Sequence, residues 1–271
     1  MSDVPDLGAL LPYRQVLSEL ERASGPSAAV VCGAEIRDAR QLVAVPGSFN
    51  PPHLAHTALL LAGLAASGAS AGAFTLSRHT VDKERVHGLL LEDRLWLLCQ
   101  LLADLQPAGG PRLTASLGVV ATSGGLYVEQ ATALRHLCPR LERVVFVVGF
   151  DKIVQIFDRR YYAEPERALD DLFAQASFLV APRQQHTARD LQALLEQPAN
   201  RRYATGVVPL AVDPALAHIS STAAREAAAA GEPIDGLVPP RVARFVAASD
   251  CFRQLEGQGR YAARVAALEA L

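Results

Sequence analysis

The sequence predicts an α/β protein built on a Rossmann-like, doubly wound sheet that is mainly parallel and has helices on both faces. Apolar, strand-like runs alternate with helical runs along most of the chain, which is typical of parallel strands joined by crossover helices. Gly47 and Gly149 each follow an apolar run, and in such sheets ligands bind at the carboxyl ends of the strands. With 271 residues, 50% of them hydrophobic, the chain can bury one large core. We therefore expect one α/β domain with its site beside these two glycines.

The elements fall into three parts along the chain. Residues 1–40 are an N-terminal extension with one helix and one short strand, whose role the sequence does not indicate. Residues 41–252 form the main domain. Residues 253–271 are expected to form an alanine-rich amphipathic helix, which could pack on the domain or against a second subunit. In the second case the protein would be a homo-oligomer. Short apolar runs predict strands at residues 29–32, 41–45, 72–76, 113–120, 143–148, 177–180 and 206–212.

The most informative segment is residues 45–56, VPGSFNPPHLAH. It reads as the end of a buried strand, a tight turn at Gly47 and the start of a helix after two prolines. His53 and His56 then lie on one face of the helix start, where unpaired backbone amides and the helix dipole attract phosphate oxygens. The pattern indicates a phosphate site. The alternative is a strand, turn and helix with two solvated histidines.

A second segment, residues 218–231, has the sequence HISSTAAREAAAAG and reads as another helix start. Ser220, Ser221 and Thr222 are candidate N-terminal caps. Arg225 is expected in the first turn, where a cation opposes the helix dipole by about 0.3 to 1 kcal/mol. An anionic ligand would reverse that penalty. The alternative is a capped surface helix with a solvated arginine.

Together the two segments resemble the paired signatures of the nucleotidylyltransferase superfamily, GxFxPxHxGH and ISSTxxR, which face each other across one nucleotide. Within it the chain looks most like the nicotinamide or nicotinate mononucleotide adenylyltransferases. Its LVPPRVARFVAAS is similar to their closing helix, and its FVVGFDKI is similar to their central strand ending in GxD. The resemblance covers about residues 41 to 252. It implies transfer of AMP from ATP to a mononucleotide, with release of pyrophosphate, in NAD biosynthesis.

The resemblance also implies a role for each matching residue. His56 would contact the transferred α-phosphate with His53 beside it, while Lys83, in a closing loop, and Arg225 would neutralise the β and γ phosphates. Mg²⁺ would be bound through the nucleotide phosphates without a dedicated protein metal site. Tyr127 and Tyr162 are candidates for stacking on the pyridine ring of the acceptor. The residues expected to bind the nucleotide are Gly47, Ser48, Phe49, Asn50, Gly149, Asp151, Ile219, Ser220, Ser221 and Thr222.

Two departures from the family pattern leave alternatives open. Ala55 stands where the family usually has glycine, and its methyl group crowds the place where backbone and phosphates come close. The family usually stacks the pyridine on tryptophan, but the single tryptophan, Trp96, lies in an apolar helix and is expected in the core. The alternatives are a cytidylyltransferase, an adenylyltransferase for another phosphorylated acceptor, and a nucleotide-binding protein that has lost turnover.

Composition narrows the class of partner. The net charge of −2 gives no general attraction to nucleic acid or anionic membranes. The sequence has no apolar run of transmembrane length and no signal-peptide pattern. Neither a Walker A loop nor a GxGxxG dinucleotide fingerprint is present. We therefore expect a cytoplasmic enzyme that acts on small-molecule nucleotides, with neither nucleic acid nor membrane as a partner.

Cysteine and lysine are both used sparingly. The four cysteines are far apart and show no CxxC spacing, so we interpret them as reduced core residues. Of the 26 basic Lys and Arg residues only Lys83 and Lys152 are lysines, and each follows an aspartate. We assign the position of Lys152 to chance. The cysteines are Cys32, Cys99, Cys138 and Cys251.

Overall fold

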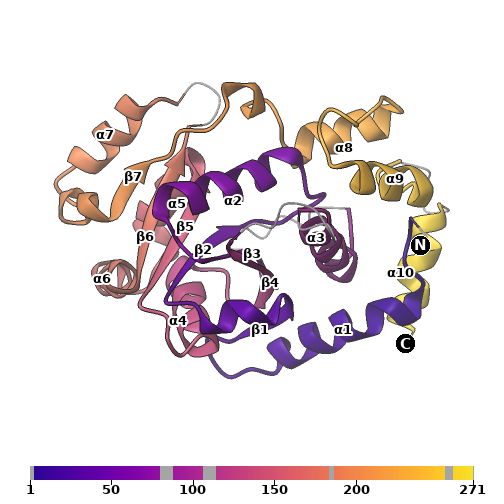
Figure 1. The fold of residues 1–271 in the computed structure, drawn as a ribbon, viewed down its shortest axis with the longest axis horizontal. Coiled ribbons are helices and arrows are strands. Elements are labelled where there is room, and N and C mark those ends of the chain that lie inside the picture. The colour runs from indigo at the N-terminus through magenta and orange to yellow at the C-terminus, as the bar shows by residue number, and fades with distance from the viewer. Residues whose placement is uncertain (1–2, 80–87, 106–113, 183–185, 254–258, 271) are drawn as a thin grey trace.

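A computed structural model describes residues 3–79, 88–105, 114–182, 186–253 and 259–270. The centre of the molecule is a seven-stranded sheet with the order β1-β4-β3-β2-β5-β6-β7 (Figure 1). Every neighbouring pair is parallel except β1 and β4, which are antiparallel. The α/β class and the mainly parallel sheet are therefore confirmed. The strands are Ala28–Cys32 (β1), Gln41–Pro46 (β2), Ala71–Ser77 (β3), Ser116–Thr122 (β4), Arg143–Gly149 (β5), Ala176–Ala181 (β6) and Val207–Pro209 (β7).

The last strand is shorter than the sequence indicates. Pro209 has no amide hydrogen to donate to a ladder, and β7 ends there. The amide of Leu210 still donates to the carbonyl of Val180, at 2.8 Å, before the chain leaves the sheet. The segment that follows runs from β7, at one edge of the sheet, back over α2 to α8 (Figure 1).

Helices cover both faces of the sheet, as the doubly wound pattern predicts. One face packs on α4, α5, α6 and α7, and the other on α1, α2 and α3. A third apolar cluster, beside the sheet, joins α3, α8, α9 and α10. The helices are Leu7–Glu21 (α1), Leu54–Ser67 (α2), Leu91–Leu105 (α3), Tyr127–Leu137 (α4), Phe150–Phe157 (α5), Pro165–Gln175 (α6), Ala188–Glu196 (α7), Ser221–Ala230 (α8), Pro240–Ser249 (α9) and Arg260–Glu269 (α10), with short 3₁₀ turns at Ala34–Asp38, Arg159–Tyr161, Arg201–Gly206 and Pro214–Leu216.

The N-terminal extension is part of the sheet. Its helix and strand are α1 and β1, and β1 pairs with β4 at the edge of the sheet. A disulfide joins Cys32 of β1 to Cys99 of α3, so the prediction that these two cysteines are reduced is wrong. They are 67 positions apart in sequence, but the fold brings their Cα atoms to 6.1 Å, a distance that a disulfide spans. Cys138, which is buried, and Cys251 are free, as expected.

The C-terminal helix packs on the domain. It begins at Arg260 after Gly259 as N-cap, and residues 254–258 of the expected helix lie outside the described residues. Its Arg264 forms an ion pair with the fully buried Asp93 at the start of α3, at 2.7 Å. The hydroxyl of Tyr261 donates to the same carboxylate at 2.7 Å, and its burial raises the pKa of Tyr261. Both ends of the chain lie on this side of the molecule (Figure 1).

Trp96 of α3 is a core residue, as expected. Its side chain is 7% exposed and packs near the ring of Phe245 in α9. It therefore has no part in the cavity described below. None of the helices in the described part of the chain is both long and apolar enough to cross a membrane.

Candidate active site

A cavity of about 380 Å³ opens at the carboxyl ends of the parallel strands. It lies where the strand order reverses, since the chain proceeds from β2 to β3 on one side and from β5 to β6 on the other. Gly47 follows β2 and Gly149 follows β5, and both line the cavity. The position expected for the site is therefore the position of this cavity. Of the residues singled out from the sequence, those lining it are Gly47, Ser48, His53, Ala55, His56, Tyr127, Gly149, Lys152, Ile219, Ser220, Ser221, Thr222 and Arg225.

The turn after β2 is held by close packing around Gly47. A Cβ atom there would lie 3.0 Å from the ring of Phe49, so a larger residue would displace that ring. Phe49 itself has a positive φ of 48° and is fully buried. Its ring lies 5.5 Å from that of Phe74 and 4.6 Å from that of His56. Phe49 therefore packs against the ring of His56 and does not itself line the cavity.

The two histidines form a stacked pair at the start of α2. His53 is the N-cap residue, and its backbone amide donates to Nδ1 of His56 at 3.0 Å. The two ring centroids are 3.6 Å apart, with an angle of 23° between the ring planes. Because Nδ1 of His56 accepts a hydrogen bond, a neutral His56 ring carries its proton on Nε2, which can then donate to a ligand. His53 is only 8% exposed, so the alternative of two solvated histidines does not hold.

The second motif begins a helix as predicted. The hydroxyl of Ser220 caps α8 by accepting from the amide of Ala223 at 3.1 Å, and Gly231 ends the helix in the left-handed conformation. The expectation that Arg225 lies in the first turn is wrong, because α8 begins at Ser221 and Arg225 is its fifth residue. Side chains on a helix lean toward its N-terminus, however, so the guanidinium still reaches that end.

Direct hydrogen bonds join the two motifs. The hydroxyl of Ser221 donates to the carbonyl of Pro51 at 2.8 Å. Arg225 donates through Nη1 to the carbonyl of Asn50 at 2.7 Å and through Nη2 to Oγ1 of Thr222 at 3.2 Å. Segments some 170 residues apart thus share one wall of the cavity. Their helix N-termini and the cation of Arg225 make that wall electropositive.

The same turn is anchored from a third element, α3. Arg94 donates through Nη1 to the carbonyl of Ser48 at 3.2 Å and through Nε to the carbonyl of Leu89 at 2.8 Å. Burial lowers the pKa of Arg94 to about 10. The side chain of Asn50 is fully buried and its Oδ1 accepts from the amide of Leu89 at 2.9 Å. Asn50, expected to bind nucleotide, therefore holds the backbone of the turn.

The β5 side of the cavity contains a residue that the sequence did not single out for function. Gly149 is the N-cap of α5, and Lys152 in the first turn of that helix lines the cavity. The Nζ of Lys152 donates to Oε1 of Gln155 at 2.8 Å. Asp151 and Lys152 are both exposed, but only Lys152 lines the cavity. In the sequence, Lys152 is marked only by the rarity of lysine in this chain, which by itself does not indicate a function.

Only one of the two candidate tyrosines reaches the cavity. Tyr127 at the start of α4 lines it, and its ring meets those of Phe146 and Phe178 edge-on at 5.2 and 6.0 Å. Tyr162 does not line it, because its hydroxyl donates to the carbonyl of Ile156 at 2.8 Å. Burial raises the pKa of both hydroxyls, that of Tyr162 to about 12.

Lys83 and Mg²⁺ are two expectations that stay predictions. Lys83, expected to contact the triphosphate, lies outside the described residues. Within the described ranges, no group of three or more His, Cys, Asp or Glu side chains could hold a metal ion.

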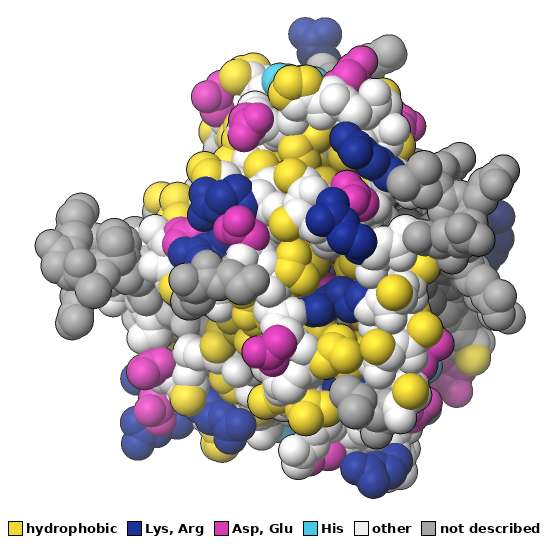
Figure 2. All heavy atoms as spheres, turned by 90° about the vertical axis from the view of Figure 1, so that its right-hand side faces the viewer, with side chains coloured by type: hydrophobic (Ala, Val, Ile, Leu, Met, Phe, Trp, Pro, Cys, Tyr) yellow, Lys and Arg dark blue, Asp and Glu magenta, His cyan; other side chains and the backbone are white. Residues whose placement is uncertain are grey.

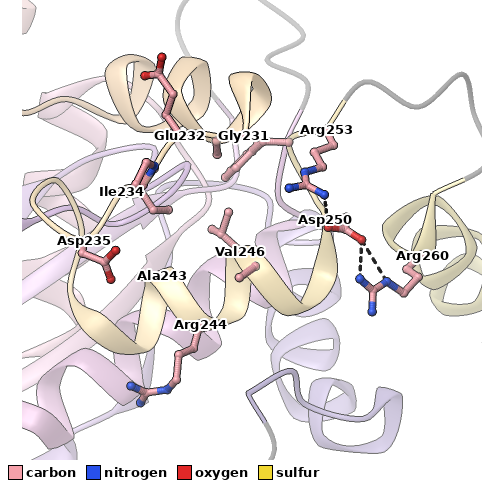
Figure 3. Close-up of a pocket in the computed structure, with 14 residues that line it drawn as sticks. Gly231, Glu232, Ile234, Asp235, Ala243, Arg244, Val246, Asp250, Arg253 and Arg260 are labelled. Carbon is pink, nitrogen blue, oxygen red and sulfur yellow. Dashed lines mark hydrogen bonds and ion pairs between the residues drawn. The ribbon is translucent and has the colours of Figure 1, made fainter.

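A second cavity, of about 490 Å³, lies between the end of α8 and helix α9 (Figure 3). Three of the charged residues that line it pair with one another, because Asp250 forms ion pairs with Arg253 at 3.7 Å and with Arg260 at 2.6 Å. The face that carries α9 and α10 shows basic and acidic side chains interspersed with hydrophobic ones (Figure 2). None of the residues of the two motifs that the resemblance assigns to catalysis lines this cavity, so it is not the candidate active site.

Comparisons with known proteins agree with the motifs. No protein-family model matches the chain. A probable nicotinate-nucleotide adenylyltransferase of Anaeromyxobacter dehalogenans strain 2CP-C is 31% identical over 219 residues, which cover 79% of this chain and 97% of that protein. One from Saccharopolyspora erythraea is 27% identical, with 79% and 90% covered.

The fold is also found among solved structures. The structure of Plasmodium falciparum nicotinic acid mononucleotide adenylyltransferase complexed with NaAD has a TM-score of 0.55 and 13% sequence identity to this chain. The match covers 79% of this chain and 97% of that one. At this identity the likeness concerns the fold, and it supports the Rossmann-like α/β architecture.

Proposed function

The chain belongs to the nicotinate-nucleotide adenylyltransferase family of nucleotidylyltransferases, and from this premise we propose that it transfers AMP from ATP to nicotinate mononucleotide, releasing pyrophosphate. The observation that carries the proposal is the direct docking of the two motifs, through Ser221 on Pro51 and Arg225 on Asn50, at one cavity. Two helix N-termini and a cation then face the same space, which suits a triphosphate.

The reaction needs no protein nucleophile. A phosphate oxygen of the acceptor attacks the α-phosphorus of ATP, a new P–O bond forms, and the bond to the bridging oxygen breaks, so that the electron pair leaves with pyrophosphate. The protein supplies position and charge stabilisation. Nε2 of His56 would donate to an α-phosphate oxygen, and the stack with His53 would hold the ring in place.

The remaining residues of the motif wall would bind the leaving group. Arg225, with the amides and hydroxyls at the start of α8, would contact the β and γ phosphates. We expect Lys83 to add a second cation there. Mg²⁺ would be held by the nucleotide phosphates and would neutralise part of their charge. On the β5 side, Gly149, which lines the cavity, would bind the nucleoside, and Tyr127 would stack on the pyridinium ring.

The experiment is an acceptor and nucleotide panel with product identification by mass. Purified protein with ATP, Mg²⁺ and nicotinate mononucleotide is expected to form the deamido form of NAD and an equal amount of pyrophosphate. Nicotinamide mononucleotide and CTP test the nearest alternatives. Formation of no dinucleotide with either mononucleotide, despite thermal stabilisation by ATP, would indicate a nucleotide-binding protein without turnover and would overturn the proposal.

A further inference from the structure

The cavity carries cations at two separate places along the sheet. Arg225 is bonded to the turn that follows β2. Lys152 is in the first turn of α5, after β5, and β5 lies between β2 and β6. Gly149 at the end of β5 pairs with Ala181 of β6, and both line the cavity with Pro182. Lys152 therefore belongs to the β5–β6 end of the cavity and Arg225 to the β2 end.

The charge of Lys152 has no counter-ion in the described part of the protein. The side chain is exposed, its Nζ bonds to a neutral amide oxygen, that of Gln155, and none of the ion pairs found among the described residues involves it. It is also the third residue of α5, where a cation opposes the helix dipole. An ammonium in this position gains stabilisation from an anion brought by the ligand.

The chemistry of the acceptor identifies that anion. In the proposed reaction the phosphates are bound at the β2 end, by His56, Arg225 and the start of α8. The other charged group of nicotinate mononucleotide is the ring carboxylate, whereas nicotinamide mononucleotide has a neutral amide at that position. The walls beside Lys152 include the ring of Tyr127 and the apolar Ala181 and Pro182, which suit a planar ring.

We propose that Lys152 is the specificity-determining residue of this cavity: its ammonium pairs with the carboxylate of nicotinate mononucleotide and so favours the acid over the amide. The inference rests on the proposed function. It adds the acceptor that the cavity prefers and the residue responsible for the preference. A charge-assisted hydrogen bond accounts for about a tenfold preference, and an amide oxygen can still accept a weaker bond.

The test compares Lys152→Met with the wild type. The kcat/KM values with nicotinate and with nicotinamide mononucleotide are measured at saturating ATP, and the affinity for each mononucleotide is measured by titration calorimetry. In Lys152→Met the preference for the acid is expected to fall about tenfold, while Lys152→Arg, which keeps the charge, retains most of it. Arg189→Met removes an exposed cation on α7 outside the cavity and is expected to change neither acceptor.

The outcomes separate the inference from the proposed function. An equal loss with both acceptors would mean that Lys152 contacts a group they share, and unchanged kcat/KM values with both would mean that it contacts neither; either result overturns the inference alone. If the wild type forms neither product, the proposed function fails. Calorimetry then still tests the role of Lys152. If the wild type binds nicotinate mononucleotide no more tightly than Lys152→Met, the inference is overturned. Thermal unfolding midpoints show whether each variant is folded.

Discussion

The two ends of the cavity are built in different ways. At the β2 end, the carbonyls of Ser48, Asn50 and Pro51 each accept a hydrogen bond from another element, α3 or α8. At the β5–β6 end, Tyr127, Lys152 and Pro182 come from separate elements, and of the polar contacts described here Lys152 bonds only within its own helix. Under the proposed function, the first end would fix the geometry of phosphate transfer, while the second could vary with the acceptor.

The largest expected effect is at His56. His56→Ala removes the Nε2 donor and should lower kcat at least about 100-fold, which is the contribution of one preorganised donor to a transition state. The measurement is the steady-state rate with nicotinate mononucleotide and ATP. His136→Ala, an exposed histidine on α4, is the matched control and should leave the rate unchanged. Wild-type turnover in a folded His56→Ala variant would remove His56 from the mechanism.

Arg225 should affect ATP more than the acceptor. Arg225→Met keeps the length of the side chain but loses both the charge and the bond to the carbonyl of Asn50. We expect the KM for ATP to rise roughly tenfold or more, as the loss of a charge-assisted hydrogen bond predicts. Arg253→Met, at the other cavity, serves as control. A KM for the acceptor that rises instead, with ATP unaffected, would contradict the division into two ends.

Tyr127 tests the opposite end. Tyr127→Leu retains an apolar side chain but removes the ring, so the KM for the acceptor should rise about threefold to tenfold, in line with a cation–π contact. The KM for ATP should stay within about twofold. The edge-on contacts of this ring with Phe146 and Phe178 require a check of folding by thermal unfolding. Equal changes in both KM values would show that the ring supports the whole cavity.

The smallest effect is expected at Ala55. Ala55→Gly restores the residue that the family pattern usually has at the start of α2. Because His56 and the turn are already held by several hydrogen bonds, we expect kcat to change less than threefold. Stability should fall by up to about 1 kcal/mol, since glycine is a poorer helix residue than alanine. An increase in kcat beyond tenfold would mean that the Ala55 methyl group restrains turnover.

The same contrast explains what the sequence could predict. The β2 end depends on local patterns, a glycine turn and two helix starts, so residues 41–56 and 218–231 predict the strand, the turn and the capped helix. The β5–β6 end depends on which side chains the fold brings together. Lys152 lines the cavity and Tyr162 does not, and no local sequence pattern predicts this difference. The Cys32–Cys99 disulfide was missed for the same reason.

Two residues of the first motif have buried positions that the sequence does not reveal, and their assignment to nucleotide binding stays a prediction. Phe49 and Asn50 stand within the first motif, and the motif alone does not tell a ligand contact from a contact that holds the turn. Their complete burial shows that they support the turn. Arg94 has a comparable role from α3, and its bond to the carbonyl of Ser48 depends on packing between elements that are far apart in sequence.

The central claim is that the two motifs bind one triphosphate between them. Its most direct test is a crystal structure of the protein with a non-hydrolysable ATP analogue and Mg²⁺. The account predicts an α-phosphate oxygen within about 2.7 to 3.2 Å of Nε2 of His56, and the terminal phosphates at the start of α8 beside Arg225. A triphosphate bound away from both motifs, for example between α8 and α9, would contradict it.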